Sequence, residues 1–245
     1  IVTYLLEGEP TGMTISSAGM IDFDPSLGDV GSYSITVTVS DGSLDDSVTF
    51  ILEVIYNLVS VDYSLDQGWN LISFYAVHPD ILIPDVFNSD PEAPLVTAFI
   101  GEGVLASYET DEWVGTLSDN IVGEEDGYWV KSAVEGNVSV SGILSSNVSY
   151  DIHVGANLIS YPFSGSQSIT DFMGDLGVDA SKIDEVVYKD TTYNDTFGGS
   201  LQFLEPKKGY WLIANTEFAF EFSDPGTAMN RPVPDRDVPE KLDYY

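Results

Sequence analysis

The stretch Tyr63-Ser-Leu-Asp-Gln-Gly-Trp-Asn-Leu-Ile-Ser-Phe-Tyr75 returns later in the chain as Tyr150-Asp-Ile-His-Val-Gly-Ala-Asn-Leu-Ile-Ser-Tyr161. A Gly-Tyr-Trp segment follows each copy, starting at Gly127 after the first and at Gly209 after the second. Because both parts recur in the same order, they indicate a duplicated structural unit rather than a chance match of a short motif. The repeat predicts an architecture and does not name a chemistry.

We expect residues 60–224 to form one pseudo-symmetric β domain, with repeat one at 60–146 and repeat two at 147–224. In each copy an apolar run after a tight turn is typical of a buried strand, and short alternating segments follow it. Each copy alone has a small core, so we expect each to cover the other's open face.

Helical spacing is restricted to two short segments of this domain. Residues 83–87 and 168–176 carry it, and Ser168 is a candidate N-cap for the second. The sequence therefore predicts an all-β fold with short helices at most.

Residues 1–57 predict a separate β structure. Two segments, 33–40 and 47–54, alternate apolar and polar residues with period two, and the turn at Asp41-Gly42 joins them as an antiparallel pair. Shorter strands precede them at the spacing of a sandwich.

The same first quarter of the chain resembles the cadherin-like, immunoglobulin-type repeats of microbial surface proteins. The resemblance is carried by Thr3-Tyr-Leu-Leu-Glu-Gly-Glu-Pro-Thr-Gly-Met-Thr-Ile15 and by Gly31-Ser-Tyr-Ser-Ile-Thr-Val-Thr-Val-Ser-Asp-Gly42, with Gly19 and Asp24-Pro25 between them. In that family the repeat begins with two further strands, which are missing before Ile1. The resemblance implies an immunoglobulin-like sandwich that lacks its first strands.

Residues 63–222 resemble the Gly-Trp-Asn-Leu-Ile-Ser modules of secreted and cell-surface proteins of bacteria and archaea. This resemblance implies an extracellular module without catalytic activity. Copy two has Ala156 where copy one has Trp69. That position is therefore not an invariable ligand contact.

Residues 225–245 are predicted to form an extended tail. Prolines at 232, 234 and 239 exclude a helix, and the Asn230-Arg-Pro start resembles the opening of another immunoglobulin-type repeat. One hypothesis is that this tail fills the strand vacancy in the first segment of the next molecule. The residues expected to take part in strand donation are Arg231, Val233, Asp235, Val238, Leu242 and Tyr244.

A second interpretation of the chain ends stays open beside strand donation. In it, residues 1–245 are a stretch of a tandem array, and the tail begins the next repeat. Both interpretations predict that the ends of successive units belong to one fold.

The charge excludes one class of partner. With 40 acidic and 8 basic residues, the net charge of −32 repels nucleic acid and anionic membrane surfaces. Cysteine is absent, so disulfides and thiolate metal sites are excluded. No apolar stretch is long enough to predict a membrane span.

Motifs of catalysis and of zinc binding are missing from the sequence. The two histidines, His78 and His153, lie in unrelated contexts, and no nucleophile elbow or phosphate-binding loop occurs. We therefore expect no enzyme and no cofactor. The four tryptophans are candidates for a sugar-stacking surface, although repeated aromatic residues are more often part of a core.

Two kinds of modification or ligand site remain as expectations. Three sequons, at Asn137, Asn147 and Asn194, predict N-glycosylation in an archaeal or eukaryotic source. Acidic clusters are candidate Ca²⁺ ligands without the spacing of an EF-hand, so the sequence leaves metal binding undecided. The clusters are Asp22/Asp24/Asp29, Asp41/Asp45/Asp46, Glu124/Glu125/Asp126 and Asp184/Glu185.

These observations together predict an extracellular, cell-surface structural protein. Its copies are expected to assemble head to tail by strand donation into a surface filament, sheath or adhesive stalk, and surface glycans are a further candidate partner. The alternative is a carbohydrate-binding or spacer module of a larger secreted or surface-layer protein.

Overall fold

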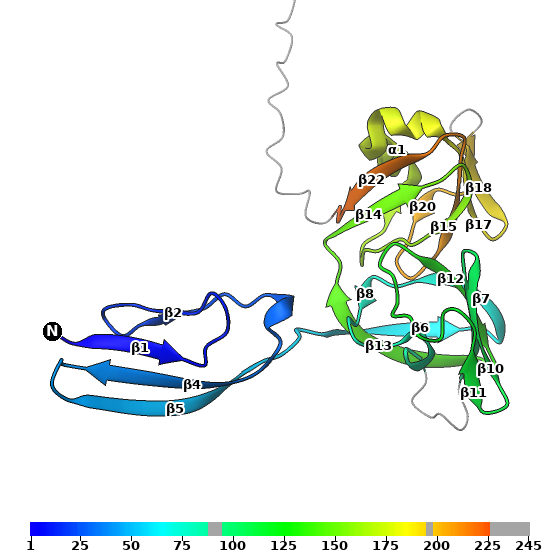
Figure 1. Cartoon of the computed structure of the whole chain (residues 1–245). Helices are drawn as coiled ribbons and strands as arrows, with labels where there is room; N and C mark the ends of the chain where they lie inside the picture. Colours follow the sequence, from blue (N-terminus) through cyan, green and yellow to red (C-terminus); the bar gives the residue numbers. More distant parts are fainter. Residues whose placement is uncertain (88–94, 195–197, 226–245) are drawn as a thin grey trace, which may run out of the picture. The chain divides into compact units, whose positions relative to one another are not determined.

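The computed structural model describes residues 1–87, 95–194 and 198–225. Antiparallel strands dominate, and the described residues include one short α-helix, so the prediction of an all-β fold with short helices is confirmed. The chain divides into two compact units, Ile1–Asn57 and a second that begins at Leu58 (Figure 1).

The first unit is a three-stranded sheet in the order β1-β4-β5, beside a small hairpin. Alternating β-branched and polar residues give the long pair β4 and β5, and they meet in continuous antiparallel register. The bounds are β1 (Thr3–Glu7), β2 (Thr14–Ile15), β3 (Ile21–Asp22), the 3₁₀ turn η1 (Leu27–Asp29), β4 (Gly31–Ser40) and β5 (Asp45–Val54).

Repeat one of the second unit is built on a five-stranded antiparallel sheet in the order β11-β10-β9-β12-β7. Its strands are β7 (Gly68–Ser73), β9 (Val96–Gly101), β10 (Val104–Glu109), β11 (Glu112–Val114) and β12 (Gly127–Ser132). A smaller sheet in the order β6-β13-β8 accompanies it. The bounds are β6 (Val59–Leu65), β8 (Ala76–Val77), β13 (Gly136–Leu144) and the 3₁₀ turn η2 (Ile83–Asp85).

Repeat two has the same order of equivalent strands, β15-β21-β17-β18-β19. Its strands are β15 (Gly155–Ile159), β17 (Ile183–Tyr188), β18 (Thr191–Asn194), β19 (Gly198–Gly199) and β21 (Tyr210–Ala214). Two strand pairs, a helix and a 3₁₀ segment complete it. These are β14 (Asn147–Ile152) with β22 (Phe218–Ser223), β16 (Gln167–Ser168) with β20 (Phe203–Leu204), α1 (Ile169–Leu176) and η3 (Gly177–Lys182). Ser168 caps α1, because its hydroxyl accepts from the Asp171 N–H.

The repeated asparagine closes the turn before each first strand. Asn70 Nδ2 donates to the carbonyls of Asp66, Gly68 and Val130, and its Oδ1 accepts from the Asp66 N–H. Asn157 makes the same set of bonds in repeat two. The intervening glycine has φ near +96° in one copy and +100° in the other, a conformation that disfavours other residues.

Each repeat contains its own hydrophobic core. Seventeen buried apolar side chains of the described residues form the cluster in repeat one, and eighteen form that in repeat two. The tyrosine of each Gly-Tyr-Trp segment, Tyr128 or Tyr210, is buried in its own cluster. Leu71 and Leu158 are buried but belong to neither cluster, and each lies beside the Gly-Tyr-Trp glycine of the other repeat. That each repeat covers the other's open face therefore stays a prediction.

The two repeats also approach each other through main-chain atoms. A Cβ built on Gly209 would lie 2.6 Å from the Ile72 carbonyl oxygen, and one on Gly127 would lie 2.7 Å from that of Ile159. The glycine of each Gly-Tyr-Trp segment is thus needed for close packing against the other repeat.

The last residue of the repeated phrase also reaches across. Ser73 donates its N–H to the Lys207 carbonyl and its hydroxyl to that of Lys208, at 3.2 and 2.8 Å. Ser160 donates its N–H to the Glu125 carbonyl and its hydroxyl to that of Glu124, at 2.8 and 2.6 Å. Both serines are buried, so these bonds fix the repeats against each other.

We predict that Gly209→Ala lowers the free energy of unfolding of the second unit by about 1–3 kcal/mol, because the added methyl group forces the two main chains apart. Urea unfolding followed by circular dichroism measures the change. Gly165→Ala is the control, since its Cβ would meet nothing within 4 Å. Equal stability of Gly209→Ala and wild type would contradict the close packing.

Candidate functional site

The outer edge of β5 is the first candidate site. β5 ends the sheet of the first unit, and within the described residues no strand pairs with its second edge. It runs for ten residues in regular register with β4. A long unpaired edge of this kind is a template for adding another strand.

The backbone groups that face this edge follow from the turn at the start of β5. The Asp41 N–H donates to the Leu44 carbonyl at 3.2 Å, which makes 41 and 44 a hydrogen-bonded pair. Such pairs alternate along an antiparallel ladder. The even-numbered residues of β5 therefore bond to β4, and the odd-numbered residues direct their N–H and C=O groups to the open edge.

Part of the core-facing side of β5 is also uncovered. In register, Phe50 lies opposite the buried Ile35, and Val48 lies opposite Val37, so all four belong to the core face. Yet Val48 is 62% exposed and Phe50 is 37% exposed. Only three side chains of the unit are buried apolar residues, namely Leu6, Met13 and Ile35. The core layer thus extends under β1 and β4 and reaches Leu52 of β5, but it leaves Val48 and Phe50 uncovered.

The sequence of β5 carries little protection against strand addition. Natural edge strands are blunted by lysine, proline, bulges or short length. Residues 45–54 contain no lysine or proline, and their pairing with β4 shows no register shift. Acidic side chains are confined to the two ends of the strand, at Asp45, Asp46 and Glu53. The middle of the edge is open and apolar.

The residues expected to donate a strand, 231–244, lie outside the described residues. Strand donation by them therefore stays a prediction. The sequence predicted a strand vacancy in the first unit but did not place it at β5, because alternation alone does not say which face of a strand is covered.

The three sequon asparagines all lie in strands. Asn137 and Asn147 are exposed, in β13 and β14, and Asn194 is half-buried at the end of β18. The sequon of Asn194 extends into residues outside the described range. Asn147 Nδ2 donates to the Glu221 carboxylate, and Asn194 Nδ2 donates to the Asp184 carbonyl at 2.7 Å.

The acidic clusters do not converge on a cation site. In the described part of the chain, no three or more carboxylates and histidines are placed to hold a metal ion. Asp29 and Asp41 instead accept hydrogen bonds from neighbouring N–H groups of their own turns, which lowers the pKa of both carboxyls. Burial, together with the charge of Glu125, raises the pKa of Glu124 and of Asp126.

The tryptophans do not form the cores of the repeats. Trp129 and Trp211 are half-buried and pair in register with Leu71 and Leu158, on the sheet face opposite the buried tyrosines. Trp69 is 45% exposed, with Lys131 Nζ 5.8 Å from its ring centroid. Trp113 packs against the buried Phe99. Trp69, at the position where repeat two has Ala156, is thus exposed.

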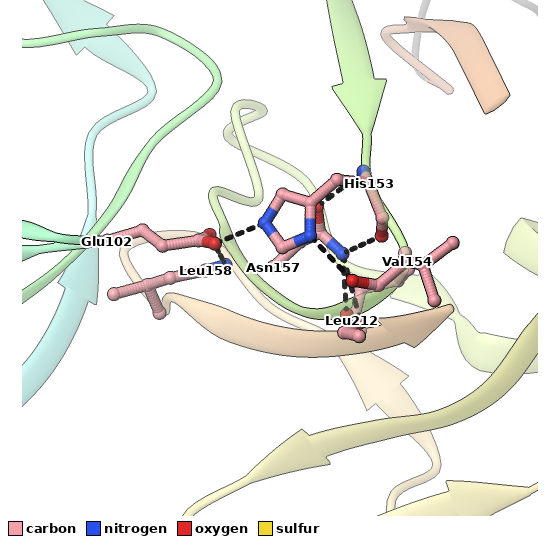
Figure 2. A network of polar contacts seen from close by, with 7 residues as sticks. Glu102, His153, Val154, Asn157, Leu158 and Leu212 are labelled. Carbon is pink, nitrogen blue, oxygen red and sulfur yellow. Dashed lines mark hydrogen bonds and ion pairs between the residues drawn. The ribbon is translucent and has the colours of Figure 1, made fainter. Parts of the chain in front are cut away.

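His153 belongs to a contact between the two repeats, which Figure 2 shows in detail. Its Nε2 pairs with Glu102 Oε1, and its Nδ1 lies 2.9 Å from the Val154 carbonyl oxygen. The second carboxylate oxygen of Glu102 accepts from the Leu158 N–H at 2.8 Å. Glu102 comes from the turn after β9, so its carboxylate joins repeat one to repeat two.

No family model, curated protein or solved structure matches the chain. Among the described residues, no helix is long and apolar enough to cross a membrane.

We predict that the Glu102–His153 contact stabilises the second unit at low pH. The Val154 carbonyl and the Glu102 carboxylate raise the pKa of His153 above its ordinary value of 6.5. The stabilisation is therefore complete below the pKa of the unfolded state and is lost as pH rises through the folded pKa. Compared with wild type, His153→Gln should have a lower melting temperature at about pH 5 and a nearly equal one at about pH 9. A difference that is the same at both pH values would contradict this assignment.

Proposed function

We propose that the protein is an extracellular structural protein whose copies assemble head to tail. The first unit of one copy accepts an extended segment from the next copy, along β5. The single observation that supports this most directly is the open edge of β5 next to the exposed core-face residues Val48 and Phe50. An added strand would supply the missing ladder hydrogen bonds and cover both side chains.

The proposed occupant is residues 230–245 of another copy. Val238, Leu242 and Tyr244 share one parity, so in an extended strand they would project to the same face. Charge opposes this docking only weakly. The first unit contains nine acidic residues and no lysine or arginine, whereas residues 230–245 carry three basic side chains, Arg231, Arg236 and Lys241, beside four acidic ones. Contact between two first units would bring together two strongly negative surfaces and is therefore disfavoured more.

Contacts of this type join different surfaces on successive copies and need not close into a ring. Repetition then produces a fibre, which fits a surface filament, sheath or adhesive stalk. The extracellular setting rests on the two resemblances and on the sequons. Non-catalytic function is part of the same proposal.

We predict that Val48→Lys prevents assembly of the full chain. Val48 is exposed in the unit itself, so lysine costs the isolated fold little, but a covering strand would bury an unpaired charge. The matched control is Ser47→Lys, on the same strand and the opposite face. Light scattering coupled to gel filtration, and electron microscopy, should show fibres or oligomers for wild type and Ser47→Lys and monomers for Val48→Lys.

Deletion of residues 226–245 tests the occupant. The truncated chain should be monomeric, and a synthetic peptide of those residues should bind it and protect the β5 amides from hydrogen exchange. A monodisperse monomer of the intact wild-type chain would reject assembly and favour the spacer or carbohydrate-binding module. Fibres formed equally by the truncated chain would reject the tail as donor.

A further inference from the structure

The two repeats meet along two equivalent surfaces, one on each side of their pseudo-two-fold relation. The register identifies equivalent residues: Trp129 pairs with Ile100, and Trp211 pairs with Val187. Two positions later in sequence, each strand reaches its turn, at Glu102 in repeat one and at Lys189 in repeat two. Glu102 therefore lies in one of the two equivalent interfaces, and Lys189 lies in the other.

The other residues of the two interfaces can be matched in the same way. Counting from the phrase glycine, His153 corresponds to Asp66, and Leu158 corresponds to Leu71. Counting from the Gly-Tyr-Trp glycine, Glu125 and Asp126 correspond to Lys207 and Lys208. The charge on the side chains is therefore reversed between the interfaces, from acidic on one side to basic on the other.

The first interface is closed by a carboxylate of the protein. Glu102 occupies it, accepting from the Leu158 N–H and pairing with His153, and Figure 2 shows its carboxylate directed at both groups. This interface demonstrates that the edge N–H of the phrase leucine binds a carboxylate group in this fold.

The second interface is an open cleft of about 240 Å³. Lys189 stands where Glu102 stands in the first, and the described residues include no ion pair between Lys189 and Asp66. Lys189 has φ of +53°, a conformation that is uncommon for a residue with a side chain. The backbone turn therefore does not explain a lysine at this position.

Three of the five described lysines line this cleft, in a chain of net charge −32. The ammonium groups of Lys208 and Lys189 lie 4.8 and 5.5 Å from the ring centroid of Tyr188. Lys207 Nζ donates to the Asp62 carbonyl at 2.9 Å. Two carboxylates are near, since Lys208 pairs with Glu205 and Asp66 lines the cleft, which leaves one more ammonium than carboxylate.

The Leu71 N–H points into the same cleft. Backbone N–H groups along a strand alternate between its two edges. The Ser73 N–H crosses to the Lys207 carbonyl, so the Leu71 N–H, two residues earlier, is directed to the same edge. Leu71 is among the residues that line the cleft. In the described chain no carboxylate takes the place beside it that Glu102 takes beside Leu158.

We propose that this cleft binds a small carboxylate ligand, with the carboxylate accepting from the Leu71 N–H and lying among Lys189, Lys207 and Lys208. The group would occupy the position that the Glu102 carboxylate occupies in the other interface. The cleft has room for a ligand the size of one sugar ring. This inference is independent of strand acceptance by the first unit.

The test is a titration of the isotope-labelled full chain carrying Val48→Lys, a substitution outside the cleft that is expected to keep the chain monomeric, followed by its amide NMR spectrum. Acetate presents the bare carboxylate, glucuronate presents it on a sugar ring, and glucose is the neutral control. We expect both acids to shift the Leu71 amide resonance in a saturable way and glucose to leave it unchanged. The affinity should fall as salt is added. Absence of a saturable shift with either acid, or an equal response to glucose, would overturn the proposal.

Two substitutions make the test specific. Lys189→Glu supplies the protein's own carboxylate at the equivalent position, and it should weaken binding of glucuronate about tenfold or more. Lys131→Glu makes the same charge change outside the cleft and should leave the affinity within about twofold of wild type. An equal loss of glucuronate affinity in both variants would mean that net charge alone causes the effect, and it would overturn the proposed binding site.

The reciprocal variant examines the other interface. Glu102→Ala removes the carboxylate that covers the Leu158 N–H. Acetate should then shift the Leu158 amide resonance, which is insensitive to acetate in wild type. An unresponsive Leu158 in this variant would contradict the claim that the phrase leucine is a carboxylate donor site.

Discussion

The close approach of two main chains at Gly127 and Gly209 is the constraint on which the second unit depends. Each glycine packs against a carbonyl of the other repeat, and the phrase serines bond to carbonyls beside those glycines. Carbonyl partners are the same whatever side chain their residue carries. The relation between the repeats is therefore independent of most side chains that surround it.

This independence allows the two interfaces to differ in chemistry while the fold stays the same. Glu125 and Lys207 both accept a serine N–H through their carbonyls, so their side chains are free to carry opposite charges. One interface gathers carboxylates, whose burial raises the pKa of Glu124 and Asp126. The other gathers ammonium groups around Tyr188. The main-chain contacts between the repeats demand neither arrangement.

The sequence was sufficient to predict the strands and the short helix, but it did not predict which side chains from distant segments lie next to one another. Period-two alternation and the repeated phrase predict the strands, and the Ser168 cap follows from local chemistry. The cleft joins residues around 63–72 to residues around 188 and 206–208, and no local pattern connects segments so distant. A signal was nevertheless present. Aligning the copies on Gly127 and Gly209 places Glu125 against Lys207 and so reveals the reversal of charge.

The sequence pattern also could not predict that part of β5 is uncovered. Alternation assigns Val48 and Phe50 to a core face without saying whether other side chains cover that face. The structure has three buried apolar side chains for 57 residues, and a unit of that size is marginal even with a complete core. Extending the core under Val48 and Phe50 requires apolar atoms from outside this unit. A strand meets this need better than a helix, because it pairs with the free N–H and C=O groups of β5 while its alternate side chains cover the apolar face. The open edge and the exposed face thus specify the same kind of partner, an extended segment with apolar residues at every second position.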